Sequence, residues 1–159
     1  MVWGGGLIAE MGAIDFAGGT VVHINAGIAA LVLALLIGPR IGFGKEPMPP
    51  HNMPMTLIGA ALLWAGWFGF NVGSELAADG VAGAVMINTQ IAAAAAVLGW
   101  LFIESLQKGK ASLLGGVSGA ISGLVAITPA CAVVGPMGAI ILGFVASIFA
   151  YWACTSLKK

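Results

Sequence analysis

Residues 15–39 read DFAGGTVVHINAGIAALVLALLIGP, and this stretch decides the fold. From Phe16 to Pro39 it contains no Asp, Glu, Lys or Arg. A run of about 20 apolar helical residues is long enough to cross the hydrocarbon core of a bilayer. We therefore predict a transmembrane helix over residues 17–38.

Uncharged stretches continue along the rest of the chain. Residues 52–74 and 80–103 can each hold one span, whereas residues 111–157 are too long for one crossing and must turn. The prolines of TPACAVVGP (128–136) interrupt a helix and supply that turn. We predict an all-α integral membrane fold in which one transmembrane domain covers residues 1–159, with five spans at 17–38, 53–74, 81–103, 113–130 and 136–156.

The composition excludes several classes of protein. Of the 159 residues, 60% are hydrophobic and 8% are charged, whereas a soluble domain carries about 25% charged residues. Six basic and six acidic residues give no net charge and no basic block for nucleic acid. Residues 1–10 lack the positive region of a signal peptide. Cys131 and Cys154 fall near opposite faces of the membrane and are expected to be unbridged.

Charged residues alternate between the connecting segments. Lys and Arg residues occur in three segments, namely between the first and second spans, between the third and fourth, and after the fifth: Arg40, Lys45, Lys108, Lys110, Lys158 and Lys159. Residues 1–16, 75–80 and 128–136 contain none. Because basic loops stay on the cytoplasmic side, we predict that the N-terminus lies outside and the C-terminus lies in the cytoplasm of a cell membrane.

His23 and Asp15 are ionisable residues at the first span. An ionisable side chain inside a span is costly and is a functional candidate by default, although His23 could also be a neutral side chain hydrogen-bonded between helices. A neutral imidazole can donate and accept hydrogen bonds, which suits the passage of a polar molecule or a proton. Asp15 could attract a cation at the outer entrance, or it could simply accept hydrogen bonds at a helix start.

The second span carries a mixed aromatic and polar face. Trp67, Phe70, Asn71 and Ser74 follow the spacing i, i+3, i+4, i+7 of one helix face. Such a face suits a pore lining, and the alternative is an interfacial aromatic belt. Trp3 lies at the same outer end, where an aromatic ring can attract an ammonium-type cation.

Motifs of the common enzymes are missing from the sequence. It contains no HExxH, GxSxG or GxxxxGK[ST] motif, and His51 falls in a loop as an ordinary surface residue. We therefore expect no enzyme activity, no metal site and no cofactor.

Several of these segments resemble the ammonium transporter (Amt/Mep/Rh) family on its microbial side. The resemblance extends over essentially the whole chain, and these segments carry it: DFAGGTVVHINAGIAALV (15–32), GFGKE (42–46), PHNMPM (50–55), GWFGFNVGS (66–74), INTQIAAAAAVLGW (87–100), SLLGGVSGAISGLVAITPAC (112–131) and LKK (157–159). The resemblance implies five of eleven spans, roughly the fifth to the ninth, of a trimeric transporter with a pore through each subunit.

The resemblance also implies roles for single residues. In this family ammonium is recruited at an outer site and loses a proton, and ammonia passes a phenylalanine gate and a histidine pair. Trp3 and Ser74 resemble the recruitment pair, Asp15 the aspartate that organises the outer site, and Thr128 a threonine near it. Phe70 resembles one gate phenylalanine and His23 the first histidine, whereas the other gate phenylalanine and the second histidine have no counterpart here.

Three functions are compatible with these residues. A channel or transporter for ammonium or ammonia is preferred, with the lipid bilayer, a homotrimer and a cytoplasmic regulatory protein as partners. An ammonium sensor of the same family is the second reading, although no signalling domain is visible. A membrane-embedded hydrolase that uses Asp15, His23 and a serine is the third, and the missing nucleophile motif argues against it.

Overall fold

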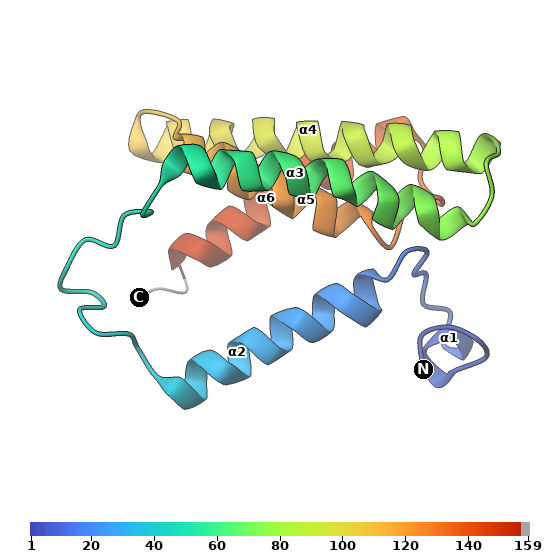
Figure 1. The fold of residues 1–159 in the computed structure, drawn as a ribbon, viewed down its shortest axis with the longest axis horizontal. Helices are drawn as coiled ribbons and strands as arrows, with labels where there is room; N and C mark the ends of the chain where they lie inside the picture. The colour runs from blue at the N-terminus through green and yellow to red at the C-terminus, as the bar shows by residue number, and fades with distance from the viewer. Residues whose placement is uncertain (157–159) are drawn as a thin grey trace.

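The computed structural model describes residues 1–156, and all regular structure in this range is helical (Figure 1). The predicted all-α fold is confirmed. The helices are α1 (Leu7–Glu10), the π-helical turn η1 (Gly19–Ile24), α2 (Asn25–Ile37), α3 (Met53–Asn71), the 3-10 turn η2 (Val72–Glu75), α4 (Gly80–Lys108), α5 (Leu113–Ile127) and α6 (Pro136–Ser156).

Polar side chains begin three of the long helices. The Asn52 side chain accepts a hydrogen bond from Met55 N (2.9 Å) before α3. Asp79 and Ser112 accept equivalent bonds from the first turns of α4 and α5. Each cap gives an otherwise unpaired backbone N–H group a partner, which fixes where the helix starts.

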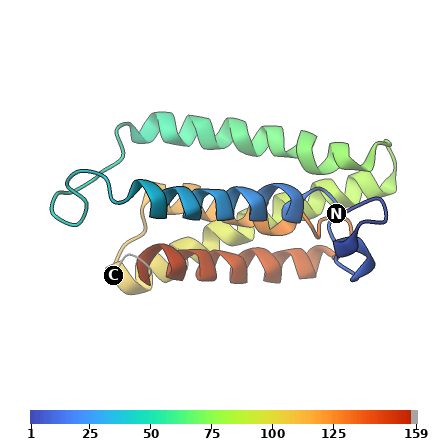
Figure 2. The same ribbon diagram turned by 90° about the horizontal axis from the view of Figure 1, so that it is seen from below.

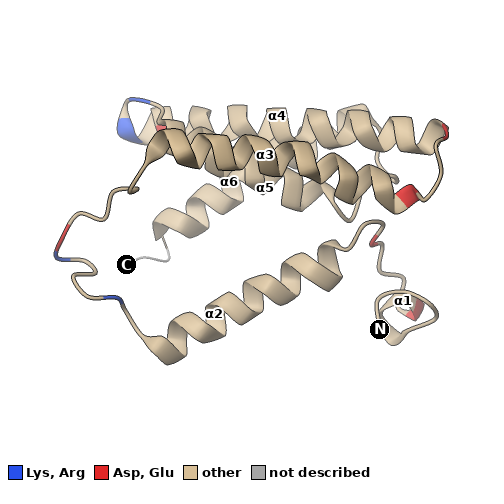
Figure 3. Cartoon of the chain, in the orientation of Figure 1, with Lys and Arg blue, Asp and Glu red and all other residues tan. Residues whose placement is uncertain are grey.

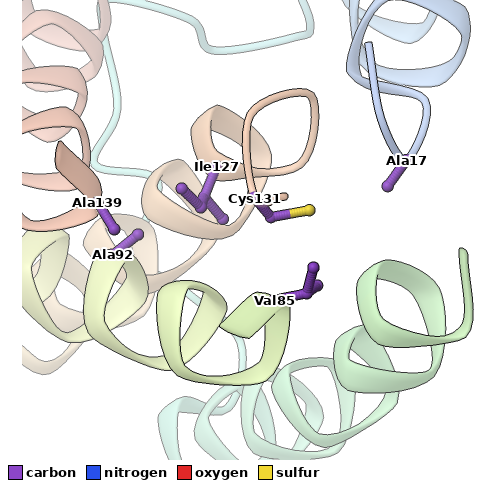
Figure 4. Close-up of a cluster of buried hydrophobic side chains, with 6 residues drawn as sticks. All are labelled: Ala17, Val85, Ala92, Ile127, Cys131 and Ala139. Atoms are coloured by element: carbon purple, nitrogen blue, oxygen red, sulfur yellow. The ribbon is translucent and has the colours of Figure 1, made fainter. Parts of the chain in front are cut away.

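Helices α4, α5 and α6 pack closely through small residues. A Cβ atom added to Gly123 of α5 would lie 2.6 Å from Ala92 O of α4, and one added to Gly143 of α6 would collide with the same carbonyl. Without side chains at these glycines the helix backbones can approach each other closely, as is usual in lipid. The buried cluster beside them draws on α4, α5, α6 and the segments before η1 and after α5: Ala17, Val85, Ala92, Ile127, Cys131 and Ala139 (Figure 4).

Helix α2 lies apart from this group. None of the residues Asn25–Ile37 is buried, and Figure 1 shows α2 separated from α3 and α4 along most of its length. Viewed from below, α2 runs along the same direction as the other long helices (Figure 2). Its apolar side chains are therefore free to contact lipid or further protein.

Four helical segments are long and apolar enough to cross a membrane: Gly19–Ile37, Met53–Glu75, Gly80–Lys108 and Pro136–Ser156. Helix α5 is shorter, with 15 residues. The chain turns between α5 and α6 at residues 128–135, within the proline-containing segment. The membrane crossings themselves stay predictions.

Charged residues separate along the long axis. Lys and Arg residues lie at the end where α3 begins and α4 ends, and acidic residues lie mainly at the opposite end (Figure 3). Two basic residues used in the orientation prediction, Lys158 and Lys159, lie outside the described residues.

Candidate functional site

Asp15 begins the segment that carries His23. Its side chain is buried, with 8% of the residue exposed, and both carboxylate oxygens accept backbone hydrogen bonds from the start of η1. The donors are Gly18 N (2.9 Å) and Gly19 N (2.7 Å) to Oδ1, and Thr20 N (2.8 Å) and Val21 N (3.3 Å) to Oδ2. Asp15 therefore makes the contacts of a helix start, where backbone N–H groups favour an anion.

Trp3 lies against this helix start. Its indole Nε1 donates a hydrogen bond to Asp15 O (2.6 Å), and the residue is 51% exposed. A Cβ atom added to Gly18 would lie 3.5 Å from Trp3 Cη2 and 3.9 Å from Phe70 Cε2, so the two rings flank the same glycine. Gly18 has φ +112°, a left-handed conformation that a glycine adopts without strain. The structure thus brings Trp3, Asp15 and Phe70 together.

Three rings form a cluster on the side of η1. The His23 imidazole stacks on Trp67 with ring centroids 5.2 Å apart and an interplanar angle of 23°. Phe70 meets the imidazole edge-on, at 5.8 Å and 73°. Within residues 1–156 no group makes a hydrogen bond to the buried His23 Nε2. The imidazole therefore has one nitrogen free for a partner that this part of the chain does not supply.

Trp67 is held on its other side by Thr128. The indole Nε1 donates to Thr128 Oγ1 (2.9 Å), and this hydroxyl donates to Leu124 O (2.7 Å). Thr128 is fully buried. The hydrogen bond connects α3 to the end of α5 and limits the rotation of the indole ring.

The side chains of Asn71 and Ser74 form hydrogen bonds with groups other than the His23 imidazole. Asn71 is fully buried, and its Nδ2 donates to Thr89 Oγ1 of α4 (3.1 Å). The Ser74 hydroxyl donates to Phe70 O (2.7 Å), one turn earlier in the chain. Of the four residues on the predicted face, Trp67 and Phe70 contact His23, whereas Asn71 faces α4.

Gly19 and Pro129 form a contact that the sequence alone did not predict. A Cβ atom added to Gly19 would lie 2.5 Å from Pro129 Cδ, and Phe16 N donates to Pro129 O (2.9 Å). The glycine pair directly after Asp15 was the available signal, because glycine often marks a close backbone approach. The end of α5 therefore contacts η1 directly.

A cavity of about 260 Å³ lies beside the imidazole. It is lined by Gly19, Thr20, His23, Ile24, Val125, Ala126 and Pro129. Among residues 1–156, no group of three or more His, Cys, Asp or Glu side chains could hold a metal ion. His51 lies in the exposed connection before α3, far along the chain from this cluster.

Comparisons with known proteins identify the family. A sequence model described as the Ammonium Transporter Family matches residues 1–159. An ammonium transporter of Bacillus subtilis is 52% identical over 158 residues, which is 99% of this chain. The chain belongs to the ammonium transporter family. It spans 39% of the length of that relative.

Solved structures of ammonium transporter relatives share the fold. The crystal structure of Candida albicans Mep2 superposes with a TM-score of 0.91 and 38% identity, and the match covers 99% of this chain and 36% of Mep2. A protein described as Sensor Amt Protein superposes with a TM-score of 0.92 and 34% identity, over 99% of this chain and 43% of its own. The resemblance to the Amt/Mep family and the membrane-protein fold class are confirmed.

Proposed function

We propose that the full-length protein moves ammonium or ammonia across a cell membrane. In this proposal, this chain supplies the outer entrance and the part of the pore directly next to that entrance. One observation carries the proposal beyond family membership. The His23 imidazole contacts Trp67 and Phe70 and keeps a buried nitrogen without a partner among residues 1–156, within a mostly apolar group of helices. A membrane segment that leaves such a group unpaired is expected to offer it to a permeant or a further side chain.

The entrance combines an aromatic ring, a carboxylate and a hydroxyl. Trp3 offers a half-exposed ring face to a cation, Asp15 adds negative charge beneath it, and Ser74 supplies a hydroxyl at the same end of α3. We propose that ammonium loses a proton there and that ammonia passes Phe70. The His23 imidazole then accepts or donates hydrogen bonds as ammonia crosses and takes part in moving the released proton. Trp67 completes the proposed lining. Asn71, which the sequence places on the same face, is fully buried and donates to Thr89 of α4, so we leave it out of the lining.

The proposal also covers the orientation of the protein in the membrane, its assembly and its regulatory partner. The N-terminus lies outside, the C-terminus lies in the cytoplasm, and the full-length protein is a homotrimer of subunits with separate pores. The basic end of the molecule is the cytoplasmic end, where a regulatory protein would bind. Thr128 is expected near the outer site.

An ammonium sensor is the second candidate, because the Sensor Amt Protein superposes as well as Mep2 does. The hydrolase reading has no comparable support, since the relatives are named ammonium transporters. A sensor can bind ammonium without moving it, so accumulation separates the two candidates.

Methylammonium accumulation in vesicles that contain the full-length protein tests the transport function. We expect uptake by the unaltered protein, and His23→Ala should reduce it about tenfold or more, because a buried hydrogen-bonding group on the path is lost. His51→Ala is the matched control and should leave uptake unchanged, since His51 is exposed in a loop. Binding of methylammonium without accumulation would favour the sensor and overturn the transporter.

A further inference from the structure

We infer that Thr128 and Pro129, the two residues after α5, position the His23 imidazole by holding the two structures on either side of it. Thr128 holds Trp67 of α3 through a hydrogen bond, and Pro129 holds η1 through packing and a backbone hydrogen bond. Both residues are positioning residues and neither touches the permeant. This inference rests on the proposed function, because it assigns how one pore residue of that function is oriented.

The orientation of the His23 imidazole depends on what contacts the ring. Within residues 1–156, no hydrogen bond of the His23 side chain joins it to another residue, and its Nε2 is buried without a partner. Among these residues, the imidazole is therefore positioned by ring contacts, of which the stack on Trp67 is the closest, at 5.2 Å between centroids. Stacked aromatic pairs contribute about 0.5–1.5 kcal/mol, which is enough to favour one orientation but not to enforce it.

The Trp67 ring is held by a hydrogen bond to Thr128. An indole ring has one donor, and Trp67 Nε1 gives it to Thr128 Oγ1 (2.9 Å). The hydroxyl passes its own proton to Leu124 O (2.7 Å), so its direction is fixed by the α5 backbone. The hydrogen-bond chain Trp67–Thr128–Leu124 therefore transfers the rigidity of α5 to the ring on which His23 stacks.

The turn η1, which carries the imidazole itself, is held by Pro129. Gly19 lies so close to the Pro129 ring that no Cβ atom fits between them, and Phe16 N donates to Pro129 O (2.9 Å). The π-helical turn is thus held against the same two-residue segment that fixes Trp67. Because Thr128 and Pro129 are adjacent, they set the distance between the imidazole and the indole.

The burial of Thr128 distinguishes positioning from binding. The residue is 0% exposed, and its hydroxyl already accepts from Trp67 and donates to Leu124. An ammonium ion could contact this oxygen only after the Trp67 ring had moved away. Thr128 therefore acts on transport through Trp67 and His23.

Four variants of the full-length protein test this inference. Thr128→Val keeps the shape of the side chain and removes the hydroxyl, whereas Thr128→Ser keeps the hydroxyl. Trp67→Phe removes the indole donor, alone or together with Thr128→Val. Ser147→Ala is the matched control, because Ser147 is also fully buried and donates to a carbonyl of its own helix, Phe144 O (2.8 Å), without contacting an indole donor.

Two readouts are needed, and one does not depend on transport. Methylammonium uptake should fall about tenfold in Thr128→Val, since the Trp67 donor is left unpaired, and should recover in Thr128→Ser. The rate at which diethyl pyrocarbonate modifies His23, followed by mass spectrometry of its peptide, should rise several-fold in Thr128→Val. In the Trp67→Phe background, Thr128→Val should add little to either effect, because the hydrogen bond is already absent.

The outcomes separate this inference from the proposed function. If the unaltered protein does not accumulate methylammonium, the transport proposal fails, and the modification rate of His23 still tests the positioning. Equal changes in Thr128→Val and Ser147→Ala, or full additivity of Thr128→Val with Trp67→Phe, would overturn the inference. Recovery in Thr128→Ser combined with non-additivity supports it.

Discussion

At the scale of the residue, the backbone around His23 is shaped by Asp15 and a glycine pair. Four N–H groups converge on one carboxylate, which is possible because Gly18 adopts a left-handed conformation. The turn that follows is π-helical, a form that occurs as short insertions and often at functional sites. Nothing in the spacing of residues 15–24 predicted this turn, because helical periodicity does not distinguish an α-helix from a single π turn.

Gly19→Ala should damage both folding and uptake. The added Cβ would lie 2.5 Å from Pro129 Cδ, so η1 has to move away from the end of α5. Overpacking of this kind costs about 1–3 kcal/mol, and we expect a lower unfolding temperature together with reduced methylammonium uptake. Gly27→Ala is the control, since nothing lies within 4 Å of a Cβ added there and alanine favours a helix. An unchanged unfolding temperature in Gly19→Ala would contradict the close contact.

At the scale of the element, the face of α3 shows what sequence spacing can and cannot predict. Successive helical residues lie about 100° apart, so Phe70 and Asn71 stand at opposite edges of the predicted face. The edge with Phe70 meets His23, whereas the edge with Asn71 meets Thr89 of α4. The spacing located the face, but it could not specify the neighbouring helix on each edge, because that depends on long-range packing.

The connection between α4 and α5 depends on a buried carboxylate. Glu104 is 4% exposed and accepts hydrogen bonds from Ser112 N (3.1 Å) and Ser112 Oγ (3.0 Å), which places the start of α5 against the end of α4. Lys108 Nζ lies 3.2 Å from Glu104 Oε1, but the lysine side chain is 57% exposed. From the sequence, this region is predicted only as a basic loop, because a single acidic residue at a helix end gives no spacing signal.

Glu104→Gln should therefore destabilise the protein more than Lys108→Met does. The first change removes a charged acceptor of buried hydrogen bonds, which costs about 1–3 kcal/mol. The second removes an exposed ion pair, which contributes about 0–1 kcal/mol. Thermal unfolding of the purified full-length protein measures the difference. Equal losses of unfolding temperature would show that the lysine, and not Ser112, is the main partner of Glu104.

At the scale of the whole molecule, hydrophobic stretches and charges were the most informative signals. The uncharged stretches of the sequence overlap the helices α2 to α6, and that these helices cross a membrane stays a prediction. The sequence did not indicate that α2 would lie apart from α4–α6, because its apolar residues fit a protein contact and a lipid contact equally well. The ring cluster could be predicted only in part, since Thr128 and Pro129 act through contacts between residues distant in the chain.

The separation of charge along the molecule leads to a prediction of its orientation. Ala77 lies in the connection between α3 and α4 at the acidic end, and Lys110 lies in the connection between α4 and α5 at the basic end (Figure 3). Basic loops are retained in the cytoplasm, so the two connections should face opposite sides of the membrane. Cysteines introduced as Ala77→Cys and Lys110→Cys report this with a maleimide that cannot cross the bilayer.

The labelling is done in a protein in which Cys154 has been replaced, because the thiol of Cys154 is exposed. Cys131 can stay. Cys131 is fully buried, and burial raises the pKa of its thiol to about 11, so at neutral pH almost none of the reactive thiolate is present. In intact cells we expect Ala77→Cys to react and Lys110→Cys to react only after the membrane is opened. Labelling of both positions from the same side would refute the orientation. Reaction of Lys110→Cys alone in intact cells would invert it and would place the Trp3 and Asp15 entrance in the cytoplasm.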